Sequence, residues 1–212
     1  MAERPAFFHH RNRVISKMYS FEWFPGFAVS QKQKSIESLH AAIRKMDADA
    51  RPLEVSTKSK LPIGGKLSAF HLKLHQNTLE NIFQSAKVFE KGGPYPDLLQ
   101  VSPKEAKRDK RLRDSGPLKA FQYQGEEFPL FPRTVFYDYI YIAAVKESLT
   151  PAEISEISSF DYFTDIEFNP AKSLNTQARA VSIIRLLLDE YGRLPDLSKD
   201  AFIQYHKEHV VV

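Results

Sequence analysis

The chain has 212 residues, of which 42% are hydrophobic, so it is long enough to bury one sizeable core, and it contains no internal repeat. The absence of cysteine excludes disulfide scaffolds, thiolate zinc sites and cysteine nucleophiles, and no apolar run reaches the length of a membrane span. The net charge of +4 mildly favours an anionic partner. The lack of cysteine and of a membrane span predicts a soluble, cytoplasmic protein that has no membrane partner.

Hydrophobic spacing in the first half of the chain predicts a helix among short strands. The basic and aromatic segment up to about residue 20 is typical of an arm or an edge strand. The elements expected after it are a helix over 35–46, a strand over 53–57, a turn at Gly64 and Gly65, and a strand over 67–75. In that last strand, Phe70, Leu72 and Leu74 would share one face because side chains alternate along a strand.

Capping signals mark the second half. Ser102 and Thr150 are each followed by Pro and, at the third helical position, by Glu, which is the pattern of a capping box. The other expected elements are a hairpin over 120–130 around Gly125 and helices over 133–146, 174–191 (closed by Gly192) and 198–206. The chain is therefore predicted to be an α+β protein, a mostly helical single domain with a small antiparallel sheet.

The segment 77–87 indicates a functional helix. On such a helix Glu80, Phe83, Gln84 and Lys87 fall at i, i+3, i+4 and i+7, which places them along one face. A core disfavours a carboxylate and an amine because burying unpaired charge is costly, whereas a pocket can use them. Structural alternatives stand beside this interpretation: a capping box between Asn77 and Glu80, and an ordinary exposed role for Lys87.

The loop 161–175 is rich in acids and aromatic rings and leads into the long helix. It offers Asp165 and Asn175 as groups that could contact sugar hydroxyls or position water. Ordinary loop chemistry is the alternative, with an N-cap at Ser173 or at Asn175 itself.

Two basic segments indicate a polyanionic ligand. The first places aromatic residues beside amide and basic groups, which suits a base or a nucleotide, although core packing next to a solvated charge run would explain it as well. Its members are Trp23, Phe24, Gln31, Lys32 and Lys34. The second, between residues 104 and 113, is either a solvated helix face or a surface that tracks phosphates. No glycine-rich phosphate loop, serine-hydrolase elbow or metal-ligand spacing is present, so no metal and no cofactor are expected.

Together these segments resemble the NADAR (YbiA-like) family. Residues 67–70 are similar to its Ser-Asn-Phe strand, and 79–89 to its Glu-His-x-x-Gln-x-x-Lys-Phe helix, with Asn81 in place of the histidine. Phe163-Thr164-Asp165, with Asn175 downstream, resembles its Trp-Gly-Asp and Lys-Asn-Arg segments. The resemblance is closer still to the NADAR antitoxins encoded beside DarT-type toxins, which ADP-ribosylate DNA bases. It reaches this branch through 23–36, 89–95, 105–109 and 163–180, and extends to about Leu188.

The resemblance implies an N-glycosidase domain over residues 1–190, with 191–212 as a helical tail of the same domain. It implies hydrolysis of the bond that joins ADP-ribose to guanine in DNA, which would make the protein an antitoxin to a DNA ADP-ribosyltransferase. The implied partners are ADP-ribosylated DNA and the cognate toxin. The toxin is implied as a functional partner, and direct binding to it is left open. The alternatives are an N-glycosidase of small riboflavin-pathway intermediates and a non-catalytic antitoxin that binds ADP-ribosyl-DNA or the toxin.

Within that implied activity, Glu80 is expected to be the main acid–base or electrostatic group. Lys87 is expected to be either a nucleophile or an anchor for phosphate and hydroxyl groups, and Asp165 a third catalytic group. The expected substrate contacts are Trp23, Phe24, Gln31, Lys32, Lys34, Ser68, Phe70, Gln84 and Asn175.

Overall fold

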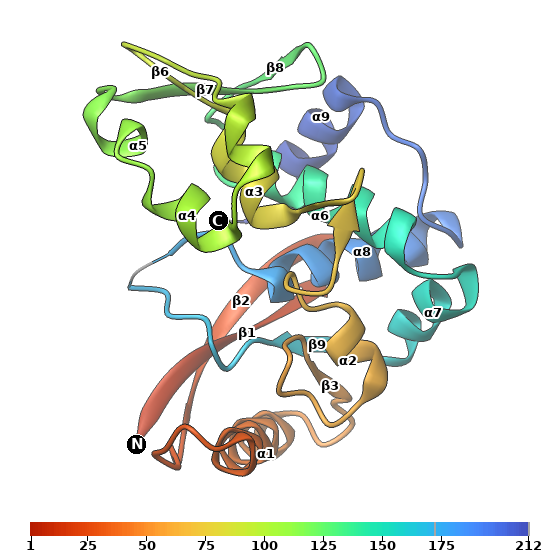
Figure 1. Ribbon diagram of the computed structural model, residues 1–212. Helices are drawn as coiled ribbons and strands as arrows, with labels where there is room; N and C mark the ends of the chain where they lie inside the picture. The colour runs from red at the N-terminus through yellow and green to blue at the C-terminus, as the bar shows by residue number, and fades with distance from the viewer. Residues whose placement is uncertain (172, 212) are drawn as a thin grey trace.

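The computed structural model describes residues 1–171 and 173–211, so Lys172 of the expected acidic loop and Val212 of the expected tail lie outside the described residues (Figure 1). Its largest sheet has the strand order β2-β1-β9-β3. The strands are β1 (Ala2–His10), β2 (Arg13–Phe21), β3 (Pro52–Glu54) and β9 (Tyr162–Thr164). The pairs are antiparallel except β3 with β9, which are parallel.

The N-terminal segment is a long hairpin: its second strand, β2, is an edge strand as predicted, whereas its first strand, β1, is not. Arg11 and Asn12 form its tip with φ of 50° and 59°, the left-handed backbone that a two-residue hairpin turn requires. Because β1 also pairs with β9 through Ala6 and Phe7, the first strand of the chain is internal to the sheet. This pairing spans more than 150 residues of sequence, so a local pattern could not reveal it.

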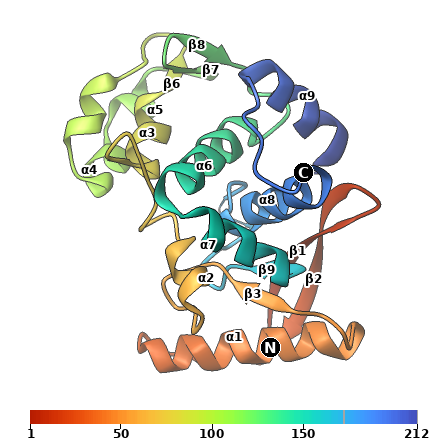
Figure 2. The same ribbon diagram turned by 90° about the vertical axis from the view of Figure 1, so that its right-hand side faces the viewer.

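Helices cover both faces of this sheet (Figure 2). α1 (Val29–Met46) packs Ile36, Leu39 and Ile43 against one face, and these positions at i, i+3 and i+7 form its apolar stripe. The helix begins at Val29, six residues before the predicted start, since the polar residues ahead of Ser35 continue it on the solvent side. α8 (Gln177–Tyr191) lies on the opposite face and belongs to the larger hydrophobic core.

The region 62–75 differs most from its prediction. Gly64 and Gly65 lie in the short helix α2 (Pro62–Lys66) and not in a turn. A side chain at Gly64 would bring its Cβ within 2.1 Å of the Glu54 carbonyl oxygen, so glycine allows this helix to approach the end of β3. Residues 67–75 are mainly turns, and only β4 (Lys73–Leu74) pairs, with β5 (Asn77–Thr78). Phe70 is 80% exposed, so it shares no buried face with Leu72 and Leu74.

The central part of the chain builds a second layer. After α3 (Leu79–Ser85), the strands β6 (Lys87–Phe89), β7 (Leu118–Tyr123) and β8 (Glu126–Phe128) form an antiparallel sheet. Between β6 and β7 lie η1 (Pro96–Gln100), α4 (Pro103–Arg108) and α5 (Arg111–Asp114). The hairpin around Gly125 is confirmed, with positive φ at Gln124 and Gly125.

The remaining helices complete the core. They are α6 (Val135–Ser148), α7 (Pro151–Glu156), η2 (Ile157–Ser159) and α9 (Lys199–His209). Both predicted capping boxes are confirmed at α4 and α7, and Gly192 ends α8 with φ of 67°. The N-cap of α8 is Thr176, whose hydroxyl oxygen accepts a hydrogen bond from the Ala178 amide, so the alternatives at Ser173 and Asn175 were wrong.

The predicted fold class, α+β with mostly helical structure in one domain, is confirmed. α9 packs Phe202, Ile203 and Tyr205 into the same core as α6 and α8. Over residues 1–171 and 173–211, the structure has no helix with the length and apolar character needed to cross a membrane.

Candidate active site

A cavity of about 520 Å³ opens beside α3. Its lining includes Glu80 and Phe83 of α3, Lys107 of α4 and Tyr137 of α6, with Phe70 exposed on it. A second hollow, of about 300 Å³, shares Phe83 and Tyr137 with the first and adds Leu174 and Asn175. Two aromatic side chains therefore form a common wall of two hollows, which together are large enough for a nucleotide-sized ligand.

Glu80 is held at this wall by neighbouring side chains. Its Oε1 accepts a hydrogen bond from Gln84 Nε2 at 2.7 Å, and its Oε2 lies 3.6 Å from Lys107 Nζ. The helix N-cap is Thr78, whose Oγ1 accepts from the Asn81 amide at 3.1 Å, so the predicted capping box with Asn77 was wrong. Glu80 therefore takes no part in capping, and its side chain lines the cavity, where a negative charge can stabilise a developing cation.

Asn81 fixes the helix that carries Glu80. Its Nδ2 donates to the carbonyl oxygens of Leu98, at 2.6 Å, and Val101, at 2.9 Å. The side chain is buried, so these bonds tie α3 to the segment that precedes α4. They set the two sides of the cavity, with Glu80 on one and Lys107 on the other.

Lys87 reaches the same wall from a different element. α3 ends at Ser85, so Lys87 is the first residue of β6 and the expected helical i+7 position was wrong. Its Nζ nevertheless lies 5.0 Å from the centre of the Phe83 ring. Burial lowers the pKa of this amine, the nearby Glu80 charge opposes that shift, and Lys107 adds to it. A lowered pKa raises the fraction of the neutral amine, which is the form that a nucleophile needs.

Asp165 lies where β9 ends. It is 8% exposed, accepts from the Glu167 amide at 3.0 Å and hydrogen-bonds Gln177. Gln177 Oε1 in turn accepts from the amide of Ala69, a residue that lines the 520 Å³ cavity, at 2.8 Å. Gln177 therefore stands near both Asp165 and the residue Ala69, while Asp165 itself is not among the residues that line either hollow. Burial, and after it the charge of Glu54, raises the pKa of Asp165 to about 8.

Glu54 is the group that the sequence reasoning missed. It ends β3, directly beside Thr164 in the parallel pair, and it is buried. A glutamate inside a three-residue apolar strand was a signal that could have drawn attention to it, although its partner Asp165 is more than 100 residues away in sequence. Adjacent parallel strands that end together bring such residues to one edge of a sheet, where ligand sites commonly form.

The aromatic and basic N-terminal residues divide into two groups. Lys32 Nζ lies 4.7 Å from the centre of the Trp23 ring and 3.4 Å from Glu167 Oε1, so both side chains flank the loop that carries Asp165. Phe24 and Gln31 are half-buried and Lys34 is exposed, and in the described part of the chain none of the three lines either hollow.

The remaining expected contacts have distinct surroundings. Phe70 and Asn175 line the hollows, whereas Gln84 is buried and holds Glu80. Ser68 is fully buried, and its hydroxyl accepts from the Phe70 amide at 3.4 Å, so its position supports the turn that presents Phe70.

The basic segment is broken into α4 and α5. Lys104, Lys107 and Arg108 of α4 line the 520 Å³ cavity. Arg111 of α5 instead pairs with Asp97 and Asp109 at 2.6 and 2.8 Å. The phosphate-binding potential is therefore concentrated on α4, beside Glu80.

A buried ionic cluster supports the rim of the second hollow. Asp138 accepts from Arg179 Nη2 at 3.1 Å and bonds His206 Nε2 at 3.0 Å. Arg179 Nη1 also donates to the Leu174 carbonyl oxygen at 2.7 Å. The cluster joins α6, α8 and α9 and places Leu174, next to Asn175, at the hollow.

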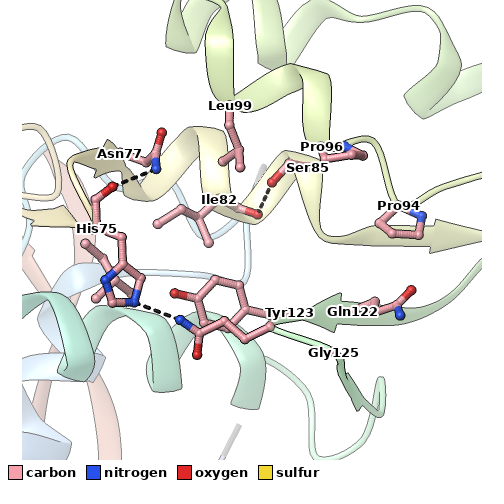
Figure 3. A pocket seen from close by; sticks show the side chains of 12 residues that line it. His75, Asn77, Ile82, Ser85, Pro94, Pro96, Leu99, Gln122, Tyr123 and Gly125 are labelled. Atoms are coloured by element: carbon pink, nitrogen blue, oxygen red, sulfur yellow. Dashed lines mark hydrogen bonds between the residues drawn. The ribbon is translucent and has the colours of Figure 1, made fainter.

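Another hollow, of about 390 Å³, lies on the other side of α3, against Ile82 and Ser85 (Figure 3). Gln124 Nε2 donates to His75 Nε2 at 2.8 Å across it. Among the described residues its lining contains no Lys, Arg, Asp or Glu, so it offers neither an acid nor an amine to a substrate. In residues 1–171 and 173–211, no three His, Asp or Glu side chains are grouped as metal ligands.

The comparison with family models assigns this α+β chain to the NADAR class. More narrowly, the chain belongs to the DarT1-associated NADAR antitoxins, whose family model matches residues 2–211. The match continues through α9, beyond the point near Leu188 where the sequence resemblance ends. A search of curated proteins finds no match to the chain.

Proposed function

We propose that this protein hydrolyses the N-glycosidic bond that joins ADP-ribose to guanine in DNA and so reverses the modification made by a DarT1-type toxin. The observation that carries the proposal is that Glu80 and the basic residues of α4 line one cavity with Phe83, and that Lys87 Nζ lies 5.0 Å from the centre of that Phe83 ring. The family match supplies the pairing with a DarT1 toxin. The substrate, the reaction and the residue roles are the parts proposed here, together with action in the cytoplasm, where the chromosome is accessible.

Cleavage of a ribose C1–N bond develops positive charge on C1 and the ring oxygen. Glu80 is placed to stabilise that charge or to take a proton from the attacking water. Lys87 provides a second route, in which its neutral amine attacks C1 of the opened sugar and water later resolves the imine. In the direct route, Lys87 serves as an anchor for hydroxyl or phosphate groups.

Charge and size favour the large substrate over a small riboflavin-pathway intermediate. Lys104, Lys107 and Arg108 line the cavity that contains Glu80, which suits the pyrophosphate and the DNA backbone. Phe70 and Phe83 offer rings to a base. Asp165 and Asn175 are proposed to contact the ribose or the water.

The test is treatment of an ADP-ribosyl-guanine oligonucleotide with purified protein in amounts below the amount of DNA. Wild-type protein is expected to release many equivalents of ADP-ribose, which separates catalysis from neutralisation by binding alone. Glu80→Gln keeps an acceptor for Gln84 but loses the charge, so it should bind the oligonucleotide with turnover reduced about 100-fold or more. Glu90→Gln, an exposed matched control, should behave as wild type.

Full turnover by Glu80→Gln would contradict the residue assignment. Release of the base from a small riboflavin-pathway intermediate, with none from the oligonucleotide, would replace the substrate. Protection of DNA only at equal or higher protein concentration would show a binding antitoxin.

A further inference from the structure

The two hollows that share Phe83 and Tyr137 differ in charge. The 520 Å³ cavity is lined by Glu80 and by three basic residues of α4. Among the described residues, the lining of the second hollow contains one charged side chain, Arg133, and its other members are mostly aromatic or aliphatic. A ligand that spans both hollows therefore meets a charged environment in one and a mainly apolar environment in the other.

The proposed substrate is divided in the same way. ADP-ribose carries two negatively charged phosphates, whereas guanine is a neutral, flat ring system that can stack through both faces. The bond between the two halves has to lie where the hollows meet, at the wall formed by Phe83 and Tyr137. Lys87 Nζ lies 5.0 Å from the centre of the Phe83 ring, and Glu80 lines the charged side of this wall. Charge complementarity therefore favours ADP-ribose beside α4 and guanine in the second hollow.

Two exposed apolar side chains line the second hollow. Phe131 is 66% exposed and Leu174 is 52% exposed. The interior of the hollow is already packed, with the rings of Phe121 and Phe136 stacked at 4.6 Å between their centres. Exposed apolar side chains that border a concave surface are typical of a binding site, and a flat base seated there would cover them.

A buried cluster fixes the segments that carry these side chains. Thr134 Oγ1 hydrogen-bonds Asp138 Oδ2 at 3.0 Å, and Arg179 Nη1 donates to the Leu174 carbonyl oxygen at 2.7 Å. Asp138 and Arg179 are themselves paired at 3.1 Å. Thr134 has a φ of 69°, which a β-branched residue rarely adopts, so the turn before α6 is held in a strained conformation. The hollow is therefore formed before a ligand binds, which lowers the entropic cost of binding.

Arg133 offers its guanidinium to this hollow. The residue is exposed, its Cζ lies 5.9 Å from the centre of the Phe131 ring, and no carboxylate of the described residues forms an ion pair with it. Arg111 and Arg179, by contrast, are each paired with an aspartate. A guanidinium presents two parallel N–H donors that match the adjacent acceptors O6 and N7 of guanine. Adenine, cytosine and thymine lack this pair of acceptors, so the contact would distinguish guanine from them.

We propose that the second hollow is the subsite for the leaving guanine, and that Arg133 selects guanine by donating hydrogen bonds to O6 and N7. Phe131 supplies a ring on which the guanine stacks. The inference rests on the proposed function and deepens it, because it names the residues that recognise the base. It requires that ADP-ribose is attached to a guanine nitrogen other than N7. It also requires an unstacked guanine, as in single-stranded DNA, since a base stacked inside a duplex cannot enter a hollow.

The first measurement separates the two halves of the substrate. Binding of free ADP-ribose is followed by calorimetry for wild type, Phe131→Ala, Arg133→Met and Lys104→Met. The first two variants should keep a Kd within about twofold of wild type, because they lie on the guanine side. Lys104→Met, on the basic side, should bind ADP-ribose more weakly. Loss of ADP-ribose binding in Phe131→Ala or Arg133→Met as large as in Lys104→Met overturns the inference, because the second hollow would then belong to the ADP-ribose half.

The second measurement is release of ADP-ribose from a modified single-stranded oligonucleotide. Phe131→Ala and Arg133→Met should each lower kcat/KM roughly tenfold, the loss expected for a stacking ring or a bidentate base contact. The matched control is Arg13→Met, an exposed arginine at the start of β2 that lines neither hollow, and it should behave as wild type. Unchanged kcat/KM in either test variant overturns the inference and leaves the proposed function intact. No release by wild type overturns the proposed function itself.

A substrate analogue tests the Arg133 contact in a way that a merely structural role cannot imitate. Modified 7-deazaguanine, which has a C–H group in place of N7, should lower the kcat/KM of wild type. Arg133→Met should lose little more on this analogue, because the missing donor and the missing acceptor belong to one contact. An analogue that wild type cleaves as fast as guanine, or losses that multiply in the variant, would exclude the contact between Arg133 and N7.

Discussion

Two buried acidic clusters in this protein have opposite electrostatic surroundings. Asp138 is paired with Arg179 and hydrogen-bonded to His206, and although burial would raise its pKa, these two partners outweigh burial and hold the pKa below its ordinary value. Among residues 1–171 and 173–211, no cation pairs with Glu54 or Asp165, and burial raises the pKa of both. The first arrangement is typical of a structural ion pair and the second of a reactive site. The difference shows that burial of an acid is not informative until its partners are known.

The largest effect is expected from breaking the paired cluster. Asp138→Ala leaves Arg179 buried without its counter-charge and should lower the free energy of unfolding by about 3–5 kcal/mol, as measured by urea denaturation. Asp114→Ala, on the exposed surface of α5, should change it by less than about 0.5 kcal/mol. Equal effects of the two substitutions would remove the distinction between a paired core cluster and a surface acid.

Substitution of Asp165 in the unpaired cluster should raise the free energy of unfolding, whereas Asp138→Ala should lower it. Because the pKa of Asp165 is raised to about 8 in the folded protein, the folded state binds more protons than the unfolded state between about pH 4 and pH 8, and wild-type stability falls as the pH rises through this range. Asp165→Asn cannot ionise, so it should be more stable than wild type at pH 9 by on the order of 2 kcal/mol, with little difference at pH 4.

Guanidinium unfolding of both proteins at several pH values measures this difference directly. The two titrate identically elsewhere, so other groups cancel. A stability difference that does not change between pH 4 and pH 9 would place Asp165 in an ordinary environment and would weaken the contrast with Asp138.

The smallest effect is expected at an exposed ion pair, which tests whether burial rather than charge creates the contrast. Lys60 and Glu37 form a salt bridge in which both side chains are more than half exposed. Lys60→Met should change the free energy of unfolding by no more than about 0.5 kcal/mol in urea denaturation. High salt should abolish even this difference, since exposed charges are screened. A loss comparable to that of Asp138→Ala would contradict the argument.

The parts of the fold that the sequence predicted well are those set by local interactions. Capping boxes at Ser102 and Thr150, the glycine end of α8 and the hairpin at Gly125 each depend on a few adjacent residues. The apolar stripe of α1 depends on one helix and one neighbouring face. All the residues that determine each of these features lie within a short stretch of sequence.

The errors occurred where a distant segment decides the structure. Lys87 leaves the helix because β6 pairs with β7, more than 30 residues further along, although neither glycine nor proline marks the end of α3. The 67–75 segment has strand-like alternation, but turns within 67–71 limit its pairing to Lys73 and Leu74. The sequence analysis placed Lys87 beside Phe83 by extending the helix to residue 87, which was wrong although the two residues do lie together. Glu54 was missed because its possible role depends on Asp165, which is distant in sequence.

The position of β1 inside its sheet has a consequence for synthesis of the protein. β1 is made before the strand on its inner side, β9, which consists of residues 162–164 and is synthesised more than 150 residues later. Until then the nascent hairpin exposes an unpaired edge, which is a surface prone to stick to other chains. The same late strand delivers Asp165. The growing polypeptide therefore cannot bring Asp165 beside the end of β3 until β9 has been synthesised and has paired with β1 and β3.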